Sequence, residues 1–379
     1  MIPSFDDFAT PLSEVAPLSE LDGAVVAIEA SHYLGRLLMN PSSKEPLLAA
    51  LGGLPFTMRT TVQNEIAAFR DANIKPIFVF DGLDVSKTKA VFQQADEAVR
   101  ANTTAWSLYN QHQAENAVTA FGESCAVTAE SFYRYFQLLL QELGVEFQIA
   151  PYSALAQLAY LEQRGTDFVD AVSGSHELLL FDVDKVITRL DPQQGDFMWL
   201  TRRACLEGLG NVPSDVFVDA CMLSGSAFLP TLPQLEANNS RKPTKIKAAL
   251  DLMNSFGRSG INVCLHYQDD PQFRQMDYLD RYRRSRLAVK HHAILTKDGK
   301  IELFDQTSAP GDSHEFIGQR LPDEVYFYMS KGLVGPRVLN WRTIGEIAQG
   351  PPLDNGDSND YQRFVRSQII PLRFLRVGM

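Results

Sequence analysis

The chain has 379 residues, 45% of them hydrophobic, which is enough to fill one large core or two moderate ones. Its 35 Lys and Arg stand against 46 Asp and Glu, and the net charge of −11 argues against nonspecific attraction of the whole chain to polyanions. Four scattered cysteines without a CxxC pair argue against a disulfide framework and a thiolate zinc site. Without a signal peptide or an apolar membrane span, the sequence predicts a protein of the cytosol or nucleus.

The order of predicted elements indicates an α/β fold. Short β-branched or aromatic runs at 24–28 and 76–80 predict buried parallel strands, and helical spacing fills residues 45–73 between them. The alternation continues with a helix, a strand, a helix and a strand at 129–143, 145–149, 152–164 and 168–172. We therefore expect a parallel sheet flanked by helices, with any active site at the C-terminal ends of the strands.

The same reading predicts the domain organisation. The α/β domain covers residues 1–255, with a polar, helix-prone arch inserted at about 83–120 and a helical block at about 213–255. A smaller mixed α+β region follows over 256–350, in which Asp298-Gly299 is the turn of a predicted hairpin. Residues 351–379 are interpreted as a linker, rich in turn formers, and the start of a further segment.

Three carboxylates stand where predicted strands end: Glu29, Asp81 and Glu177. An acid after a strand often only caps the next helix, but three that meet at one sheet edge can bind a divalent ion. Two such ions about 4 Å apart repel each other by on the order of 17 kcal/mol at an effective dielectric near 20. Three carboxylates are too few to offset that repulsion, so we expect the second ion to be held weakly.

Parts of the chain resemble the flap-endonuclease family of structure-specific nucleases, whose domain is PIN-like. The resemblance covers about residues 20–255 and rests on FVFDG, on APYSALAQLAYLEQRG with the following SGSHELLLFDVDKVITRL, and on DVFVDACMLSGSAFLP. It implies that Glu29 replaces an aspartate and that Asp81 is unchanged. It also implies that acids have been lost at five positions: Ser153, Leu155, Ser175, Ala227 and Pro230. Leucine offers a metal no ligand, so the resemblance implies a nuclease domain without its chemistry.

A second resemblance covers nearly the whole chain. The stretches IEASHYLGRLL, LGGLPFTMRTTVQNEIAAFRDANIKPIFVFDGL, KHHAILTKDGKIEL and LPDEVYFYMSKGLVGPRVLNWRTIGEI are similar to the maintenance-of-killer family of post-transcriptional regulators. Members of that family are longer, which implies a C-terminal domain beyond this chain. The resemblance also implies a cytoplasmic scaffold in mRNA-associated complexes such as mRNP granules or polysomes. Its implied partner is an ataxin-2-like protein that binds poly(A)-binding protein.

The run DRYRRSRLAVKHH carries five candidate nucleic-acid contacts: Arg281, Arg283, Arg284, Arg286 and Lys290. Arginine and lysine can contact phosphates, and tyrosines nearby can stack on bases. The alternative interpretation is a solvated helix face. The adjacent His291 and His292 flank a predicted strand, where neighbouring side chains face opposite sides and cannot chelate one ion together.

Three hypotheses follow for function. The first is a catalytically inactive nuclease-like scaffold that regulates mRNA translation or stability through protein partners, with no cofactor and no metal site. The second is a weak metal-dependent nuclease that holds Mg²⁺ with Glu29, Asp81 and Glu177. The third is a noncatalytic RNA-binding module that uses the basic run.

Overall fold

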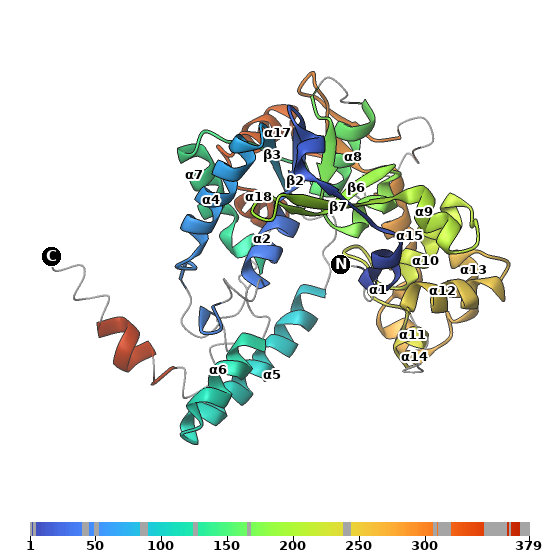
Figure 1. Ribbon diagram of the computed structural model, residues 1–379. Helices are drawn as coiled ribbons and strands as arrows, with labels where there is room; N and C mark the ends of the chain where they lie inside the picture. Colours follow the sequence, from blue (N-terminus) through green and yellow to red (C-terminus); the bar gives the residue numbers. More distant parts are fainter. Residues whose placement is uncertain are drawn as a thin grey trace. The chain divides into compact units, whose positions relative to one another are not determined.

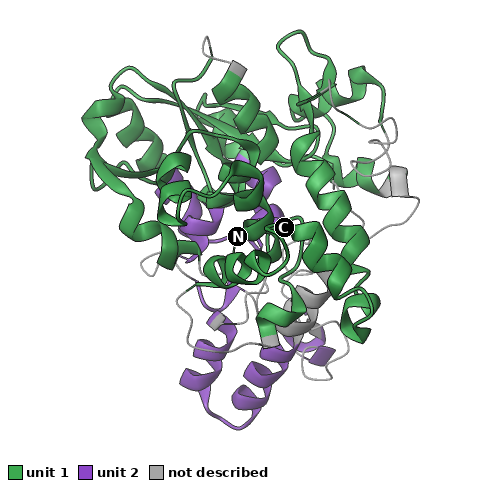
Figure 2. Ribbon diagram, turned by 90° about the vertical axis from the view of Figure 1, so that its right-hand side faces the viewer, with its two compact units in different colours: residues 1–33, 63–87, 137–344 green, residues 34–62, 88–136, 345–379 purple. Residues whose placement is uncertain are grey.

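The computed structural model describes the following parts of the chain: residues 2, 5–39, 45–48, 53–83, 90–123, 128–164, 168–237, 244–305, 309, 320–344, 362–363 and 365–371. The chain divides into two compact units (Figure 2). Unit 1 comprises residues 1–33, 63–87 and 137–344, and unit 2 comprises residues 34–62, 88–136 and 345–379. None of the helices in the described parts is long and apolar enough to cross a membrane.

Unit 1 is built on a seven-stranded sheet with the order β1-β7-β6-β5-β2-β3-β4. The five strands from β6 to β4 in that order are parallel, and β7 and β1 pair antiparallel at one edge. The strands are β1 (Glu14–Pro17), β2 (Val25–Glu29), β3 (Lys75–Phe80), β4 (Glu146–Ile149), β5 (Ala171–Ser173), β6 (Lys185–Asp191) and β7 (Asp196–Thr201). This confirms the predicted α/β class with a mostly parallel sheet.

The central strands read as continuous apolar runs because helices cover both faces of a parallel sheet. Val26 and Ala27 of β2 are fully buried, and so are Phe78 to Phe80 of β3. The chain runs outward from β2 through β3 to β4 and then returns to the other side of β2 as β5. Between β2 and β5 the strand order therefore reverses, and the C-terminal ends at such a switch point leave a crevice for ligands.

Helices cover this sheet, and a further group of helices lies to one side of it (Figure 1). Three helices begin in one unit and end in the other: α2 (Ala30–Met39), α4 (Met58–Asp71) and α7 (Tyr133–Glu142). Within unit 1 the helices before residue 256 are α1 (Phe5–Ala9), η1 (Thr10–Leu12), η2 (Leu18–Leu21), α8 (Ala154–Arg164), η4 (His176–Phe181), α9 (Arg202–Gly208), α10 (Ser214–Leu223), α11 (Pro233–Ala237) and α12 (Lys245–Asn254). The predicted helices at 129–143, 152–164 and in the 213–255 block are confirmed.

Residues 256–344, which we call the extension, lie in unit 1 with the sheet. It consists of α13 (Gly260–His266), α14 (Pro271–Gln275), α15 (Tyr278–Lys290), β8 (Ala293–Leu295), β9 (Ile301–Leu303), α17 (Asp323–Ser330) and α18 (Pro336–Ile344). The predicted hairpin is confirmed, since Leu295 pairs with Ile301 and Gly299 takes the positive φ of +77° that its turn requires.

Unit 2 contains a helical hairpin of α5 (Ala90–Asn110) and α6 (Ala114–Glu123) with a small core of its own. Trp106 and Phe121 meet edge to face across it, with ring centroids 5.1 Å apart. The 3₁₀ helix η3 (Ala129–Phe132) and the π-helical turn η5 (Val365–Ile369) also belong to this unit. The helical character predicted for the inserted stretch is confirmed over 90–123, whereas the predicted linker at 349–360 lies outside the described residues.

Sequence reasoning missed the antiparallel edge of the sheet. The strands β6 and β7 form a hairpin across the turn after Asp191, and β1 adds to β7. The apolar run at 178–181 lies in the 3₁₀ helix η4. Short apolar runs carry no helical or strand period strong enough to separate these states, so tertiary packing decides them.

The extension is hydrogen-bonded to helix α8 and its N-terminal flank through buried polar side chains. The side-chain amide of Gln157 donates to the Leu295 carbonyl and accepts from the Leu295 N–H, both at 2.9 Å, so it pairs with β8 as another strand would. Tyr152 and Tyr326 of α17 share a hydroxyl hydrogen bond of 2.9 Å. Burial raises the pKa of Tyr152, so its hydroxyl stays neutral near pH 7.

We expect Gln157→Leu to lower the free energy of unfolding by about 2–5 kcal/mol, because it leaves the buried N–H and C=O of Leu295 without their partner. Urea denaturation measures this. Gln163→Leu, on the exposed side of the same helix, removes two bonds to carbonyls and is expected to cost under about 1 kcal/mol. Equal losses in the two variants would contradict the role given to Gln157.

Candidate functional site

Glu29 ends β2 at the switch point of the sheet and is only 6% exposed. Its Oε2 accepts a hydrogen bond of 2.7 Å from the Ser175 N–H, and its Oε1 accepts one of 2.7 Å from the Ser31 hydroxyl. A Cβ at Gly174 would lie 2.6 Å from Oε2, so only glycine allows this close approach. The carboxylate thus binds protein backbone at the switch point between β2 and β5.

Asp81 follows β3 and serves as a helix cap. Its Oδ1 accepts a hydrogen bond of 2.8 Å from the N–H of Ala154, the first residue of α8. The first N–H groups of a helix have no partner within the helix, and a carboxylate also complements the positive end of its dipole. Asp81 thus caps the next helix, as an acid after a strand often does.

Glu177 is used in the same way. This buried residue lies in η4, and its Oε1 accepts a hydrogen bond of 2.8 Å from the Ala227 N–H. Ala227 follows α10, so the bond ties the loop after α10 to η4. All three carboxylates predicted from the sequence accept hydrogen bonds from backbone amides.

The donors of these bonds lie at or beside the positions where the resemblance implies lost acids. Ser175 and Ala227 are two such positions, and Ala154 lies between two others, Ser153 and Leu155. At the fifth position, Pro230, the carbonyl accepts a hydrogen bond from Tyr278 of α15. Segments that would carry metal-binding carboxylates thus present N–H groups to the remaining acids.

His292, from the extension, completes the cap of α8. Its Nε2 accepts a hydrogen bond of 3.1 Å from the Ser153 N–H, while Nδ1 lies 2.9 Å from the Ala288 carbonyl and donates to it. This pair of bonds requires the neutral ring, and burial lowers the pKa of His292 from 6.5 to about 4. The sequence pattern did not indicate this contact, because Ser153 and His292 lie 139 residues apart.

The donor set does not fit a pair of divalent ions. Across the parts of the chain that the structure describes, no group of three or more His, Cys, Asp or Glu side chains is placed so that it could hold a metal ion. Glu29, Asp81 and Glu177 come from adjacent parts of one sheet edge, but each is bonded to a different backbone segment. Leu155 is buried in the hydrophobic core and offers no ligand.

The five basic residues of the candidate nucleic-acid surface lie on α15, and two of them are engaged in ion pairs. Arg284 pairs with Asp280 at 2.6 Å one turn away. Arg286 reaches helix α10 and pairs with Asp215 at 3.0 Å and Asp219 at 2.9 Å.

The other three basic residues differ in exposure. Arg283 and Lys290 are exposed, and Arg281 is half-buried. The structure therefore supports an ion-paired, largely structural helix face more than a continuous phosphate-binding stripe. Nucleic-acid binding by α15 stays a prediction.

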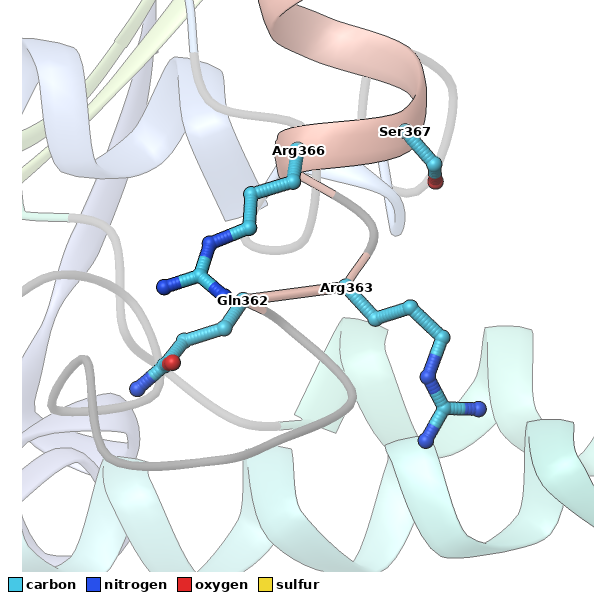
Figure 3. Close-up of a pocket in the computed structure, with 4 residues that line it drawn as sticks. All are labelled: Gln362, Arg363, Arg366 and Ser367. Carbon is cyan, nitrogen blue, oxygen red and sulfur yellow. The ribbon is translucent and has the colours of Figure 1, made fainter.

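A pocket elsewhere is lined by residues of one short segment: Gln362, Arg363, Arg366 and Ser367 (Figure 3). Figure 3 shows the Arg363 and Arg366 side chains extending in different directions. The segment belongs to unit 2, whereas the three carboxylates belong to unit 1. We assign no chemistry to this pocket.

Comparison with known proteins agrees with this fold and site. A family model described as "XPG N-terminal domain" matches residues 2–102, and one described as "Temperature dependent protein affecting M2 dsRNA replication" matches residues 310–378. The catalytic core of Rad2 in complex with DNA substrate shares 17% identity, covering 92% of this chain and all of that one, with a TM-score of 0.45. The N-terminal match identifies an XPG-like, or flap-endonuclease-like, domain in this chain.

Two curated relatives show to which family the chain belongs. The "Post-transcriptional regulator MKT1" of Cryptococcus neoformans is 33% identical over 94% of this chain and 48% of the relative. Exonuclease 1 of Arabidopsis thaliana is 23% identical over 84% of this chain and 42% of the relative. The chain thus spans about half the length of the curated relatives it matches, and it belongs to the MKT1 family of post-transcriptional regulators.

We expect Glu29→Gln to lower the free energy of unfolding by about 1 kcal/mol, because hydrogen bonds to a charged carboxylate become neutral ones. In a cluster of repelling metal ligands the same change would stabilise the metal-free protein. Thermal unfolding gives the sign of the effect. Glu146→Gln, which removes an exposed ion pair with Lys75, is the control.

Stability should also fall as the pH drops from 6.5 toward 4, because the unfolded chain protonates His292 while the folded one resists. The stability lost through this residue is on the order of 3 kcal/mol, and the loss is complete once the pH lies below the folded pKa. Denaturant unfolding of the wild type and of His292→Gln over this range measures it. Parallel pH curves for the two proteins would show that His292 is not held neutral.

Proposed function

We propose that this protein acts in post-transcriptional regulation as a scaffold, and that its nuclease-like domain binds partners without hydrolysing nucleic acid. The family supports the first part of the proposal, since the matched relatives from fungi and trypanosomes are named post-transcriptional regulators. The use of the acids supports the second part. Because the chain matches only about half of those relatives, the regulatory activity of the whole protein belongs to the proposal.

The observation that carries the proposal is the engagement of the three carboxylates by backbone amides at 2.7–2.8 Å. A carboxylate that coordinates Mg²⁺ must direct its lone pairs at the ion. Here at least one oxygen of each acid is directed at a main-chain N–H, and the five implied partner acids are Ser, Leu, Ala or Pro. Binding two ions would require new carboxylates and a different path for the backbone.

The partners in this proposal come from the family resemblance. We propose that the protein joins mRNA-associated complexes in the cytoplasm. Its partner would be an ataxin-2-like protein that binds poly(A)-binding protein, contacted by the C-terminal domain of longer family members. A scaffold of this kind needs a stable domain with conserved surfaces and does not need an open, charged cleft.

The competing hypothesis is a weak nuclease that holds one ion with Glu29, Asp81 and Glu177. We expect no cleavage of flap DNA, single-stranded RNA or hairpin RNA in Mg²⁺ or Mn²⁺ beyond that of an Asp81→Ala protein purified in parallel. We also expect about 10 mM Mn²⁺ to leave the unfolding free energy unchanged, whereas a site with a Kd near 1 mM would add about 1.4 kcal/mol. Cleavage or Mn²⁺ stabilisation that Asp81→Ala abolishes would overturn the scaffold proposal.

A further inference from the structure

Helix α17 is apolar on two sides although the described structure covers only one of them. Tyr326 and Met329 are buried against the core, and α17 packs against the edge strand β4. Phe327 and Tyr328, on the other side, are 46% and 51% exposed. A helix that is hydrophobic all round is normally covered all round, so this second face is suited to a partner.

The chain reversal after α17 enlarges this face. The Gly332 N–H donates to the Met329 carbonyl at 2.8 Å, and the Leu333 N–H donates to the Tyr328 carbonyl at 3.0 Å, which together form a Schellman motif. Gly332 has φ +71°, and a Cβ there would lie 3.2 Å from the Phe147 ring of β4. The motif brings Leu333, 72% exposed, next to Tyr328 and fixes it there.

We call four large exposed side chains of this segment the α17–α18 patch: Phe327, Tyr328, Leu333 and Val338. The rings of Phe327 and Tyr328 contact each other edge to face with centroids 5.9 Å apart. Val338 lies in the first turn of α18 and is 51% exposed. Two aromatic and two aliphatic side chains, held by a helix and its cap, form a preorganised hydrophobic surface.

The charges around this patch are predominantly basic. Between residues 323 and 344 the sequence contains Lys331, Arg337 and Arg342 against the two acids of the first turn of α17, Asp323 and Glu324, in a chain whose net charge is −11. All three basic side chains are exposed. Most of this acidic protein would repel an acidic ligand, so the segment 325–344 is a local exception that would attract one.

We propose that the α17–α18 patch binds an acidic amphipathic helix of a partner protein, which lays Leu or Phe side chains on the patch and directs Asp or Glu at Lys331 and Arg342. The family model matched at 310–378 contains the whole patch, whereas the nuclease-related model ends at residue 102. The surface therefore lies in the part of the chain that marks the regulatory family. The inference rests on the scaffold proposal, for which it names a surface and a partner chemistry.

Exposed aromatic and basic side chains also suit single-stranded RNA, but Leu333 and Val338 favour a protein partner. Stacking on bases uses flat rings, and aliphatic side chains at half to three-quarters exposure add nothing to it. A helix-in-groove partner, in contrast, uses aliphatic and aromatic anchors together, with complementary charges at the rim.

The test uses the full chain and a phage-displayed library of random peptides about 15 residues long. We expect selection to enrich peptides that carry Leu or Phe at helical spacing and an excess of Asp and Glu. A synthetic copy of the most enriched peptide should bind at least about tenfold more weakly to Leu333→Asp in fluorescence anisotropy. Lys331→Glu with Arg342→Glu should also weaken it, and the loss should shrink at high salt.

Val15→Asp is the matched control, because Val15 is 61% exposed on β1, at the opposite edge of the same sheet from β4. Both Asp variants replace exposed residues, so their unfolding free energies should stay within about 0.5 kcal/mol of the wild type. Peptide binding should be unchanged in Val15→Asp.

Three outcomes would overturn the inference: no enriched peptide, enriched peptides that bind Leu333→Asp as well as the wild type, or enrichment of basic peptides. Binding of a uridine oligonucleotide of about 20 residues that Leu333→Asp and Lys331→Glu both weaken, without peptide binding, would reassign the patch to RNA. Self-association that Leu333→Asp abolishes, without peptide binding, would reassign it to a second copy of the chain. None of these results bears on cleavage, so this inference and the loss of nuclease activity can fail separately.

Discussion

The hydrogen bond from the Ser175 amide to the Glu29 carboxylate joins β2 to the segment after β5 at the switch point of the sheet. A buried anion is costly unless hydrogen-bond donors or cations compensate it, and in a metal-dependent nuclease the ions supply that compensation. Here the main chain supplies it, and Gly174 is required because any Cβ would collide with the carboxylate at 2.6 Å. Glu29 therefore stabilises the fold at the switch point of the sheet.

The first turn of α8 shows how far this replacement extends. Its free N–H groups are satisfied by Asp81, by the Ser153 hydroxyl and by the neutral ring of His292. Because His292 and the Gln157 partner Leu295 both come from the region after residue 256, that region is part of the same folded unit as the sheet. The sheet and residues 256–344 therefore share buried hydrogen bonds that stabilise both.

Local signals made the fold readable from the sequence, whereas the contacts of the site were not readable. Apolar runs that end in Glu29 and Asp81 mark the central strands. The sequence also shows Ser153 and Leu155 at positions where the resemblance to flap endonucleases implies acids. The fate of the remaining acids is not visible, because their amide partners lie 146, 73 and 50 residues away. The basic run on α15 illustrates the same limit, since its charges are evident but Asp219 joins Arg286 only in three dimensions.

This geometry also explains why restoring single acids would not restore a metal site. An aspartate at position 175 would bring a second carboxylate toward Glu29 while the amide of that same residue still binds Glu29. Two carboxylates that share one donor in a buried site repel each other, so one of them would take up a proton instead of binding an ion. An acid at position 155 would in addition have to leave the hydrophobic core that Leu155 fills. Under the proposed function, metal binding and the present backbone path are alternatives, and the hydrogen bonds of Glu29, Asp81 and Glu177 with backbone amides favour the second.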